Sequence, residues 1–207
     1  LHNSEQMELL DVRIGDYVYV EKGGEIIPKI TGVELSMRNA ALKKPDFPEY
    51  CPDCGCRLVR DDGEAKFFCP NIHGCPTQIK GRLVHFLSRK AMNILAGDAT
   101  VDQLYNLSLV RTPADFYDLD KEQLLTLDGW KERSAERFLE SIRASKATPF
   151  ENVLFAIGIR YVGETTAKTV ARFFKNIDAV AAADKETLLS VPDVGEVIAD
   201  SIYDFFM

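Results

Sequence analysis

From Gln78 onward the hydrophobic pattern is helical, and it recurs with a long period that indicates a repeated structural unit. Four stretches align without gaps, at residues 93–101, 127–135, 159–167 and 191–199. Their fifth positions are spaced by 34, 32 and 32 residues, a period typical of repeated supersecondary units. Another apolar side chain follows three residues after each stretch, and these four are Leu104, Phe138, Val170 and Ile202. This spacing predicts a helix after each stretch, with these side chains on its inner face.

The first part of the chain has the pattern of a β-hairpin instead. Residues 17–20 are β-branched or aromatic, residues 22–25 (Lys-Gly-Gly-Glu) form a turn signal, and residues 26–30 resume the apolar pattern. Pro28 has no N–H to donate, which predicts that its strand is an edge strand or is bulged there. Two strands alone are marginally stable, so we expect a sheet or barrel that other residues complete. Residues 41–48, with two prolines and two lysines, are predicted to be a linker.

Composition narrows the class of protein. With 46% hydrophobic and 28% charged residues in 207, the chain has the make-up of one large or two to three small globular domains. No apolar run reaches the roughly 18–20 residues that a membrane helix needs, and no signal peptide opens the chain. We therefore expect a cytoplasmic protein with no membrane partner. Because it opens on Leu1-His2-Asn3 without a methionine, we expect it to be part of a longer protein.

Charge is unevenly distributed along the chain, whose net charge is −7. Residues 1–48 carry six basic and eight acidic side chains, residues 49–90 carry seven and five, and residues 91–207 carry 12 and 19. A nucleic-acid contact in the last segment cannot rest on a bulk basic field. It would have to use backbone groups or a few placed cations.

All five cysteines lie between residues 51 and 75, which indicates a metal site and not a disulfide framework. Cys51 and Cys54 form one candidate ligand pair, and Cys69 and Cys75 form the other, with fourteen residues between the pairs. Four thiolates in tetrahedral geometry favour Zn²⁺, and because such a site has no open position for water, it is structural and not catalytic. Residues 58–60 and 66–68 suit the two strands of a small zinc ribbon.

The residues alone leave this ligand set open to rivals. Cys56 could replace Cys54, although we expect it to point away from the site as a free thiol. His73 lies between Cys69 and Cys75 and could displace one of them. Iron in a rubredoxin-like site, or buried thiols without any metal, would also be compatible with the spacing.

The four repeats match the helix-hairpin-helix pattern, in which an apolar residue, a glycine-containing tip and a small residue precede a helix. We expect glycine to let the tip adopt a positive φ and to let a ligand approach closely. The helix that follows starts with unpaired N–H groups and the positive end of its dipole. Such a tip can bind phosphate without sequence preference. The candidate DNA-binding residues are Gly97, Gly129, Lys131, Arg133, Arg160, Val162, Gly163, Thr165, Lys168 and Gly195.

The four tips differ in the charge of their neighbouring side chains, and this difference ranks them as candidate phosphate sites. Gly163 has Arg160, Thr165 and Lys168 close by and ranks first, followed by Gly129 with its basic neighbours. Gly97 and Gly195 are flanked by the acidic residues Asp98, Asp193 and Glu196, so these two hairpins could be packing units only. We expect Trp130 to be a packing anchor and not a stacking platform.

Taken together, these residues closely resemble the C-terminal half of bacterial NAD-dependent DNA ligases. The resemblance covers essentially the whole chain and follows the family's order. The residues that carry it are Leu1-His2-Asn3, Arg13-Ile14-Gly15-Asp16, Gly24-Glu25-Ile26-Ile27-Pro28, the cysteine spacing, Arg111-Thr112-Pro113-Ala114-Asp115 and Gly158-Ile159-Arg160-Tyr161-Val162-Gly163-Glu164-Thr165-Thr166-Ala167. The sequence departs from the family at the tips around Leu95 and Lys131, where the family commonly has glycine, so the resemblance does not carry the family's DNA contacts over to those two tips.

The resemblance implies a multidomain, mainly α protein with three parts. These are a partial β oligonucleotide-binding (OB) fold and linker at 1–48, a four-cysteine zinc finger or ribbon at 49–78, and an all-α, four-fold helix-hairpin-helix domain at 79–207. It also implies a monomer in the bacterial cytoplasm, associated with the nucleoid, whose partner is nicked duplex DNA.

In that family, sealing a nick begins when a lysine in a Lys-x-Asp-Gly motif takes AMP from NAD. The nearest match here, Lys44-Pro45-Asp46-Phe47, lacks the glycine. We therefore expect this chain to clamp DNA by backbone-phosphate contacts without catalysis, with Zn²⁺ in the chain and NAD⁺ and Mg²⁺ used by the parent enzyme. The family's C-terminal BRCT domain has no match here either. The rival interpretation is a non-enzymatic zinc and helix-hairpin-helix module of another DNA repair protein.

Overall fold

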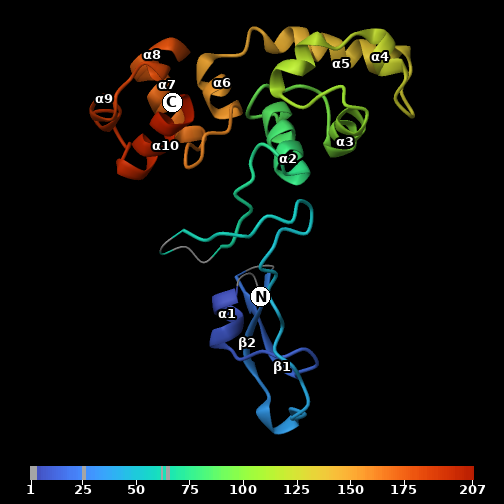
Figure 1. The fold of residues 1–207 in the computed structure, drawn as a ribbon, viewed down its shortest axis with the longest axis vertical. Helices are drawn as coiled ribbons and strands as arrows, with labels where there is room; N and C mark the ends of the chain where they lie inside the picture. The colour runs from blue at the N-terminus through green and yellow to red at the C-terminus, as the bar shows by residue number, and fades with distance from the viewer. Residues whose placement is uncertain (1–3, 25–26, 62, 64–65) are drawn as a thin grey trace. The chain divides into compact units, whose positions relative to one another are not determined.

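The computed structural model of the chain describes residues 4–24, 27–61, 63 and 66–207 (Figure 1). The chain divides into two compact units, Leu1–Pro76 and Thr77–Met207. Three stretches used in the sequence analysis contain residues outside the described ones: the opening Leu1-His2-Asn3, the turn residue Glu25 and the first predicted residue of the second strand, Ile26.

The first unit contains the predicted hairpin. Strands β1 and β2 pair antiparallel, with Val18 opposite Val33 and Gly23 opposite Ile27. In the described residues the sheet has two strands, so β2 is an edge strand, which is one of the two places expected for Pro28. The one register irregularity lies between Tyr19 and Val20 and not at Pro28. The elements of this unit are α1 (Ser4–Leu9), β1 (Val18–Gly23), β2 (Ile27–Val33) and the 3₁₀ helix η1 (Leu35–Met37).

An ion-pair network holds the loops around this hairpin. The Asp16 side chain has no exposed surface and accepts two hydrogen bonds from Arg38, from Nε at 2.9 Å and from a terminal nitrogen at 2.7 Å. Arg38 also donates to Asp11 Oδ2 at 2.6 Å. The Arg38 guanidinium lowers the pKa of Asp16, and Lys44 together with Arg38 lowers the pKa of Asp11 to about 2. Both carboxyl groups are therefore ionised at neutral pH.

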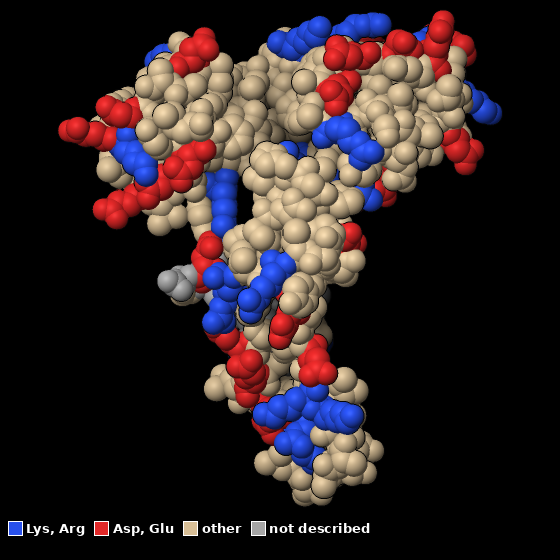
Figure 2. Space-filling view, in the orientation of Figure 1, with Lys and Arg blue, Asp and Glu red and all other residues tan. Residues whose placement is uncertain are grey.

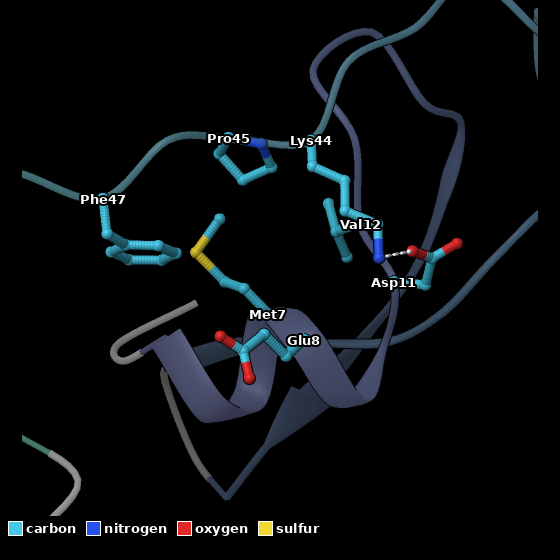
Figure 3. A pocket seen from close by; sticks show the side chains of 7 residues that line it. All are labelled: Met7, Glu8, Asp11, Val12, Lys44, Pro45 and Phe47. Carbon is cyan, nitrogen blue, oxygen red and sulfur yellow. Dashed lines mark ion pairs between the residues drawn. The ribbon is translucent and has the colours of Figure 1, made fainter.

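The segment predicted to be a linker packs against α1 (Figure 3). Lys44 and Phe47 line a small cavity of about 120 Å³ together with Met7 and Val12. The Nζ atom of Lys44 lies 2.9 Å from Asp11 Oδ1. This segment has no regular secondary structure, as expected, but its side chains anchor it, so it is not a free linker.

The second unit is built from helices, and its residues fall into two hydrophobic cores. Leu104 and Phe138 are buried in the first core, and Val170 and Ile202 in the second, each at most 1% exposed. The repeat therefore places its inward positions as predicted, two hairpins to each core. The elements are α2 (Pro76–Leu87), α3 (Asp98–Asn106), the 3₁₀ helix η2 (Pro113–Asp118), α4 (Lys121–Leu125), α5 (Glu132–Ser145), α6 (Phe150–Ala156), α7 (Glu164–Phe174), α8 (Ile177–Ala181), α9 (Lys185–Leu189) and α10 (Glu196–Phe206).

The two cores meet at Phe155 on α6, which packs against both. From α2, the His85 ring contacts the Phe155 ring edge-on at 4.6 Å, and its Nε2 lies 2.8 Å from the Phe155 carbonyl oxygen. Among the described residues, no helix is both long enough and apolar enough to cross a membrane. The mainly α fold class with a small β segment is confirmed.

Candidate metal centre and nucleic-acid interface

The four cysteines assigned to the metal come together in the first unit. The ligand atoms of Cys51, Cys54, Cys69 and Cys75 all lie within 4.8 Å of one another. Sγ of Cys51 is 3.9 Å from Sγ of Cys75, and Sγ of Cys54 is 3.5 Å from Sγ of Cys69. In a tetrahedral site with Zn–S bonds of about 2.3 Å, sulfur atoms lie about 3.8 Å apart. The sulfur positions therefore fit one thiophilic ion at their centre.

Short turns and single bridges form the module around these sulfurs. The N–H of Cys51 donates to the carbonyl of Cys56 at 2.7 Å, and Gly55 takes a φ of 70° as the chain reverses. The two predicted strands reduce to one isolated bridge between Val59 and Phe68. The expectation of regular ribbon strands was wrong for the described residues, which form isolated bridges and no strand in this module.

The thiols differ in acidity because their surroundings differ. A backbone hydrogen bond at Cys56 lowers the pKa of Cys54 to about 6. Burial raises the pKa of Cys69 to about 12. Metal ligands must be thiolates, so a cation at the centre would favour the deprotonated form of Cys69, which burial otherwise disfavours.

The two rival ligands lie outside the cluster. Within the part of the chain that the structure describes, the candidate metal group contains the four cysteines and neither Cys56 nor His73. Cys56 is half-buried beside the cluster, and its backbone carbonyl serves the first knuckle. The structure thus brings together the set that the spacing favoured.

The four hairpin tips occupy equivalent places at the starts of four helices. The fifth positions of the repeats are the residues that cap these helices: Gly97 for α3, Lys131 for α5, Gly163 for α7 and Gly195 for α10. At the three glycine caps, no side chain caps the helix by a hydrogen bond. Their first-turn N–H groups are therefore presented without a side-chain acceptor from the cap residue.

Of the two reasons expected for these glycines, positive φ does not apply at the three glycine caps. Gly97, Gly163 and Gly195 have φ angles of −120°, −79° and −89°, which any residue adopts. The positive φ falls two residues earlier in three of the hairpins, at Gly129, Tyr161 and Asp193. The expectation that the tip glycines supply positive φ is wrong for these three caps, because the chain reverses before the tip.

The open space around the cap glycines shows that packing does not require glycine there either. A Cβ atom built at Gly97, Gly163 or Gly195 would meet no atom within 4 Å. Neither backbone conformation nor internal packing therefore calls for glycine at these positions. What glycine leaves there is an uncovered backbone at the start of a helix, where an anion can approach the N–H groups closely.

Cations gather around the third tip. Gly163, Thr165, Arg160 and Lys168 are all exposed there, as expected. Lys90, from the loop after α2, joins them, because its Nζ lies 2.7 Å from Glu164 Oε2. Sequence reasoning missed Lys90, since it lies 74 residues from its partner and carries no local signal.

At the second tip the side chains are polar, and one of the tip's backbone N–H groups already has a hydrogen-bond acceptor. Lys131 and Arg133 are exposed, and Gly129 takes a φ of 79°. The hydroxyl of Ser134 accepts a hydrogen bond from the N–H of Lys131 at 2.9 Å. Trp130 is a packing anchor, as predicted: it contacts the Phe138 ring edge-on at 5.4 Å.

The first and fourth tips are acidic. The first residue of each tip helix is a carboxylate in all four repeats: Asp98, Glu132, Glu164 and Glu196. A lysine pairs with this carboxylate at the second tip (Lys121 with Glu132) and at the third (Lys90 with Glu164), whereas the fourth tip adds Asp193. Acidic side chains are prominent over α8 to α10 in the view of Figure 2. The ranking of the third tip as the first phosphate site stays a prediction.

Val162 plays a different part from its exposed neighbours. Its side chain is 6% exposed and belongs to the second core, and its N–H donates to the carbonyl of Ile159. It was included among the candidate DNA-binding residues because of its place in the tip. The structure makes its side chain a packing residue, because the apolar fourth position of the repeat turns inward.

Comparison with known protein families agrees with this arrangement. Residues 1–42 match the NAD-dependent DNA ligase OB-fold domain, and residues 50–76 match the NAD-dependent DNA ligase C4 zinc finger domain. Residues 152–207, which build the second core, match the helix-hairpin-helix motif.

Similar proteins extend over the whole chain. DNA ligases from Christiangramia forsetii, Bacteroides fragilis and Flavobacterium psychrophilum are each 51% identical to it over 207 residues. These matches include 100% of this chain but 31% of each relative, so the chain spans less than a third of their length.

The fold and the clustered thiols define a zinc-finger and helix-hairpin-helix protein of the DNA-binding class. Two of its domains are those of one ligase family, and its relatives along the entire chain are DNA ligases. The family models thus assign residues 1–42 and 50–76 to domains of NAD-dependent DNA ligases.

Proposed function

We propose that this chain is the non-catalytic, DNA-gripping portion of an NAD-dependent DNA ligase that seals nicks in duplex DNA during replication and repair. Its hairpin tips hold the sugar-phosphate backbone while other parts of the enzyme carry out the chemistry. The parent enzyme uses NAD⁺ and Mg²⁺, and this chain lacks a Lys-x-Asp-Gly motif to receive AMP. We further propose that it works as a monomer in the bacterial cytoplasm, on the nucleoid.

One observation carries the DNA-gripping role. The glycine at three tips has an ordinary φ and open space around it, so the fold does not explain its presence. Close approach of a ligand to the backbone does explain it, and a helix start attracts anions. Arg160 and Lys168 lie close to Gly163 in the chain, and Lys90 pairs with its neighbour Glu164. The contact reads phosphate and not base sequence, which suits an enzyme that must act at any nick.

Zn²⁺ is the metal we assign to Cys51, Cys54, Cys69 and Cys75. Four thiolates leave the ion no open position, so it holds the module together and takes no part in ligation. We keep the division into an OB part at 1–48, a zinc finger at 49–78 and a hairpin domain at 79–207 as part of this proposal.

The rival role, a non-enzymatic repair module, needs the same zinc finger and hairpins. The match of residues 1–42 to a ligase OB-fold domain favours the ligase. A purely structural role for the hairpins would predict no salt-dependent binding of DNA.

The test compares Gly163→Ala with Gly195→Ala in the whole chain. Both glycines cap a helix with open space around them, but the fourth tip is acidic. A methyl group at Gly163 blocks phosphate, and losing hydrogen bonds to a charged ligand costs about 1.5–3 kcal/mol, or at least about tenfold in affinity. Fluorescence anisotropy with a labelled nicked duplex measures it.

We expect Gly163→Ala to bind DNA at least about tenfold more weakly, and Gly195→Ala, at the acidic fourth tip, to weaken binding less than Gly163→Ala does. Both variants should retain the thermal stability of the parent. If Gly163→Ala binds normally, the third tip does not hold phosphate. If the unmodified chain does not bind duplex DNA even at low salt, the gripping role is wrong.

A further inference from the structure

Tyr161 has an unusual backbone conformation for its residue type. Its φ is 63°, in the left-handed region, where a bulky side chain is a genuine outlier. It occupies the third position of its repeat, which Gly129 fills in the second hairpin and Asp193 in the fourth. Those two residue types tolerate this region far better than tyrosine does. The third hairpin therefore carries a tyrosine where the backbone favours glycine.

Core packing does not account for this tyrosine. Its neighbours in the hairpin, Ile159 and Val162, enter the second core and are 4% and 6% exposed. Tyr161 itself is 40% exposed. A strained residue that leaves much of its side chain in solvent is a reason to look for a role in binding.

The aromatic ring lies beside the strongest candidate phosphate site. The guanidinium carbon of Arg160 is 4.8 Å from the centre of the Tyr161 ring. Gly163, whose backbone is open, follows two residues later, and two residues span at most about 7 Å of chain. A ring at that separation reaches the sugar next to a phosphate held at Gly163.

We propose that Tyr161 packs its ring against a deoxyribose adjacent to the phosphate bound at the third tip. This inference rests on the proposed DNA-gripping function and adds an apolar contact to it. Sugars are the nearest apolar surface in a duplex, because the bases are stacked inside and the phosphates are charged. The contact is independent of sequence, as the phosphate contact is. Because a ring displaces no counterions, it contributes equally at every salt concentration.

Salt dependence separates this contact from the charged ones. We expect Tyr161→Ala to lower affinity for duplex DNA about tenfold at each salt concentration, by analogy with aromatic stacking on nucleotides. The slope of log affinity against log salt should stay as in the unmodified chain. Arg160→Ala should instead reduce that slope by about 0.9 if it removes one phosphate contact.

Three further variants complete the experiment. Tyr161→Phe keeps the ring and should bind normally. Tyr161→Gly relieves the backbone, so it should be at least as stable as the parent yet bind as weakly as Tyr161→Ala. Phe173→Ala is the matched control, because Phe173 is also a half-exposed aromatic but lies at the far end of α7. It should bind normally.

The binding results of these variants decide whether Tyr161 contacts the DNA. Normal binding by both Tyr161→Ala and Tyr161→Gly would overturn it, and so would a loss that appears as a reduced salt slope. An equal loss in Phe173→Ala would also overturn it, since the effect would then not belong to the tip. If the unmodified chain binds DNA, these results leave the gripping role standing. Absence of binding by the unmodified chain would overturn both.

Discussion

The metal is expected to hold residues 50–76 folded, and its removal should unfold this module while the helical unit stays folded. Buried side chains in the module are Cys51, Cys69 and Cys75, with Leu58 half-buried against them. No buried aliphatic or aromatic residue joins this cluster in the described part of the chain. Burying a few thiols cannot offset the chain entropy lost on folding.

The size of the effect follows from this small core. Structural zinc supplies about 10–16 kcal/mol at neutral pH, whereas a whole ordinary domain is stable by about 5–15 kcal/mol. Without the ion, the module therefore has no favourable free energy of folding. The helical unit has two hydrophobic cores of its own, so its stability does not depend on the thiols.

Hydrogen exchange followed by mass spectrometry measures this directly. Backbone N–H groups of Cys51, Gly55, Val59, Phe68 and Cys75 are hydrogen-bonded within the module. Their protection should disappear on treatment with a strong chelator, while protection in α3, α5 and α7 stays unchanged. Zinc content is followed in parallel by native mass spectrometry.

A pair of cysteine variants tests which thiols bind the ion. Cys69→Ser removes a ligand and should abolish stoichiometric zinc. Cys56→Ser removes the fifth cysteine, which lies outside the cluster, and should retain one ion per chain. The reasoning is refuted if chelation removes the ion and residues 50–76 remain protected. Loss of zinc from Cys56→Ser but not from Cys69→Ser would refute the ligand assignment.

Two further predictions concern stability. Gly129→Ala should destabilise the helical unit by about 1–2 kcal/mol, because Gly129 has a φ of 79°, whereas Gly163→Ala should change stability by less than about 1 kcal/mol. Open space surrounds both, so equal melting temperatures would contradict this account. In the first unit, Arg38 lowers the pKa of Asp16 below its ordinary value of 3.8, so its stabilisation is complete above that pH and is lost as the pH falls through the lower folded value. Asp16→Asn should remove this loss from acid titrations of unfolding, and an unchanged acid transition would contradict the assignment.

Local sequence patterns were sufficient to predict the helix starts, the inward side chains and the metal site of this protein. The repeat period placed four helix starts and their inward side chains, because an apolar residue at helical spacing must turn toward a core. The cysteine spacing predicted which four thiols share one site, since each short knuckle brings its two sulfurs close together. Trp130 could likewise be assigned to packing from its place in the repeat.

Backbone conformation was harder to predict. The pattern located glycines at the tips, but positive φ, one of the two reasons expected for them, does not hold at Gly97, Gly163 and Gly195. Positive φ belongs to the third position in three hairpins, where tyrosine and aspartate also occur. A sequence shows which residues tolerate such a conformation, but the surrounding turn decides where the chain adopts it.

The sequence by itself determined the helical repeat and the family resemblance and favoured the thiol set, because each follows from residue types and their spacing along the chain. Only the tertiary structure decided how the repeats share two cores, that Lys90 reaches the third tip, that Val162 is buried, and that residues 44–47 pack on α1. These features join residues that are distant along the chain or depend on which side of a turn faces the core. Their geometry follows from packing and charge pairing of the whole fold, and spacing in the sequence does not encode it locally.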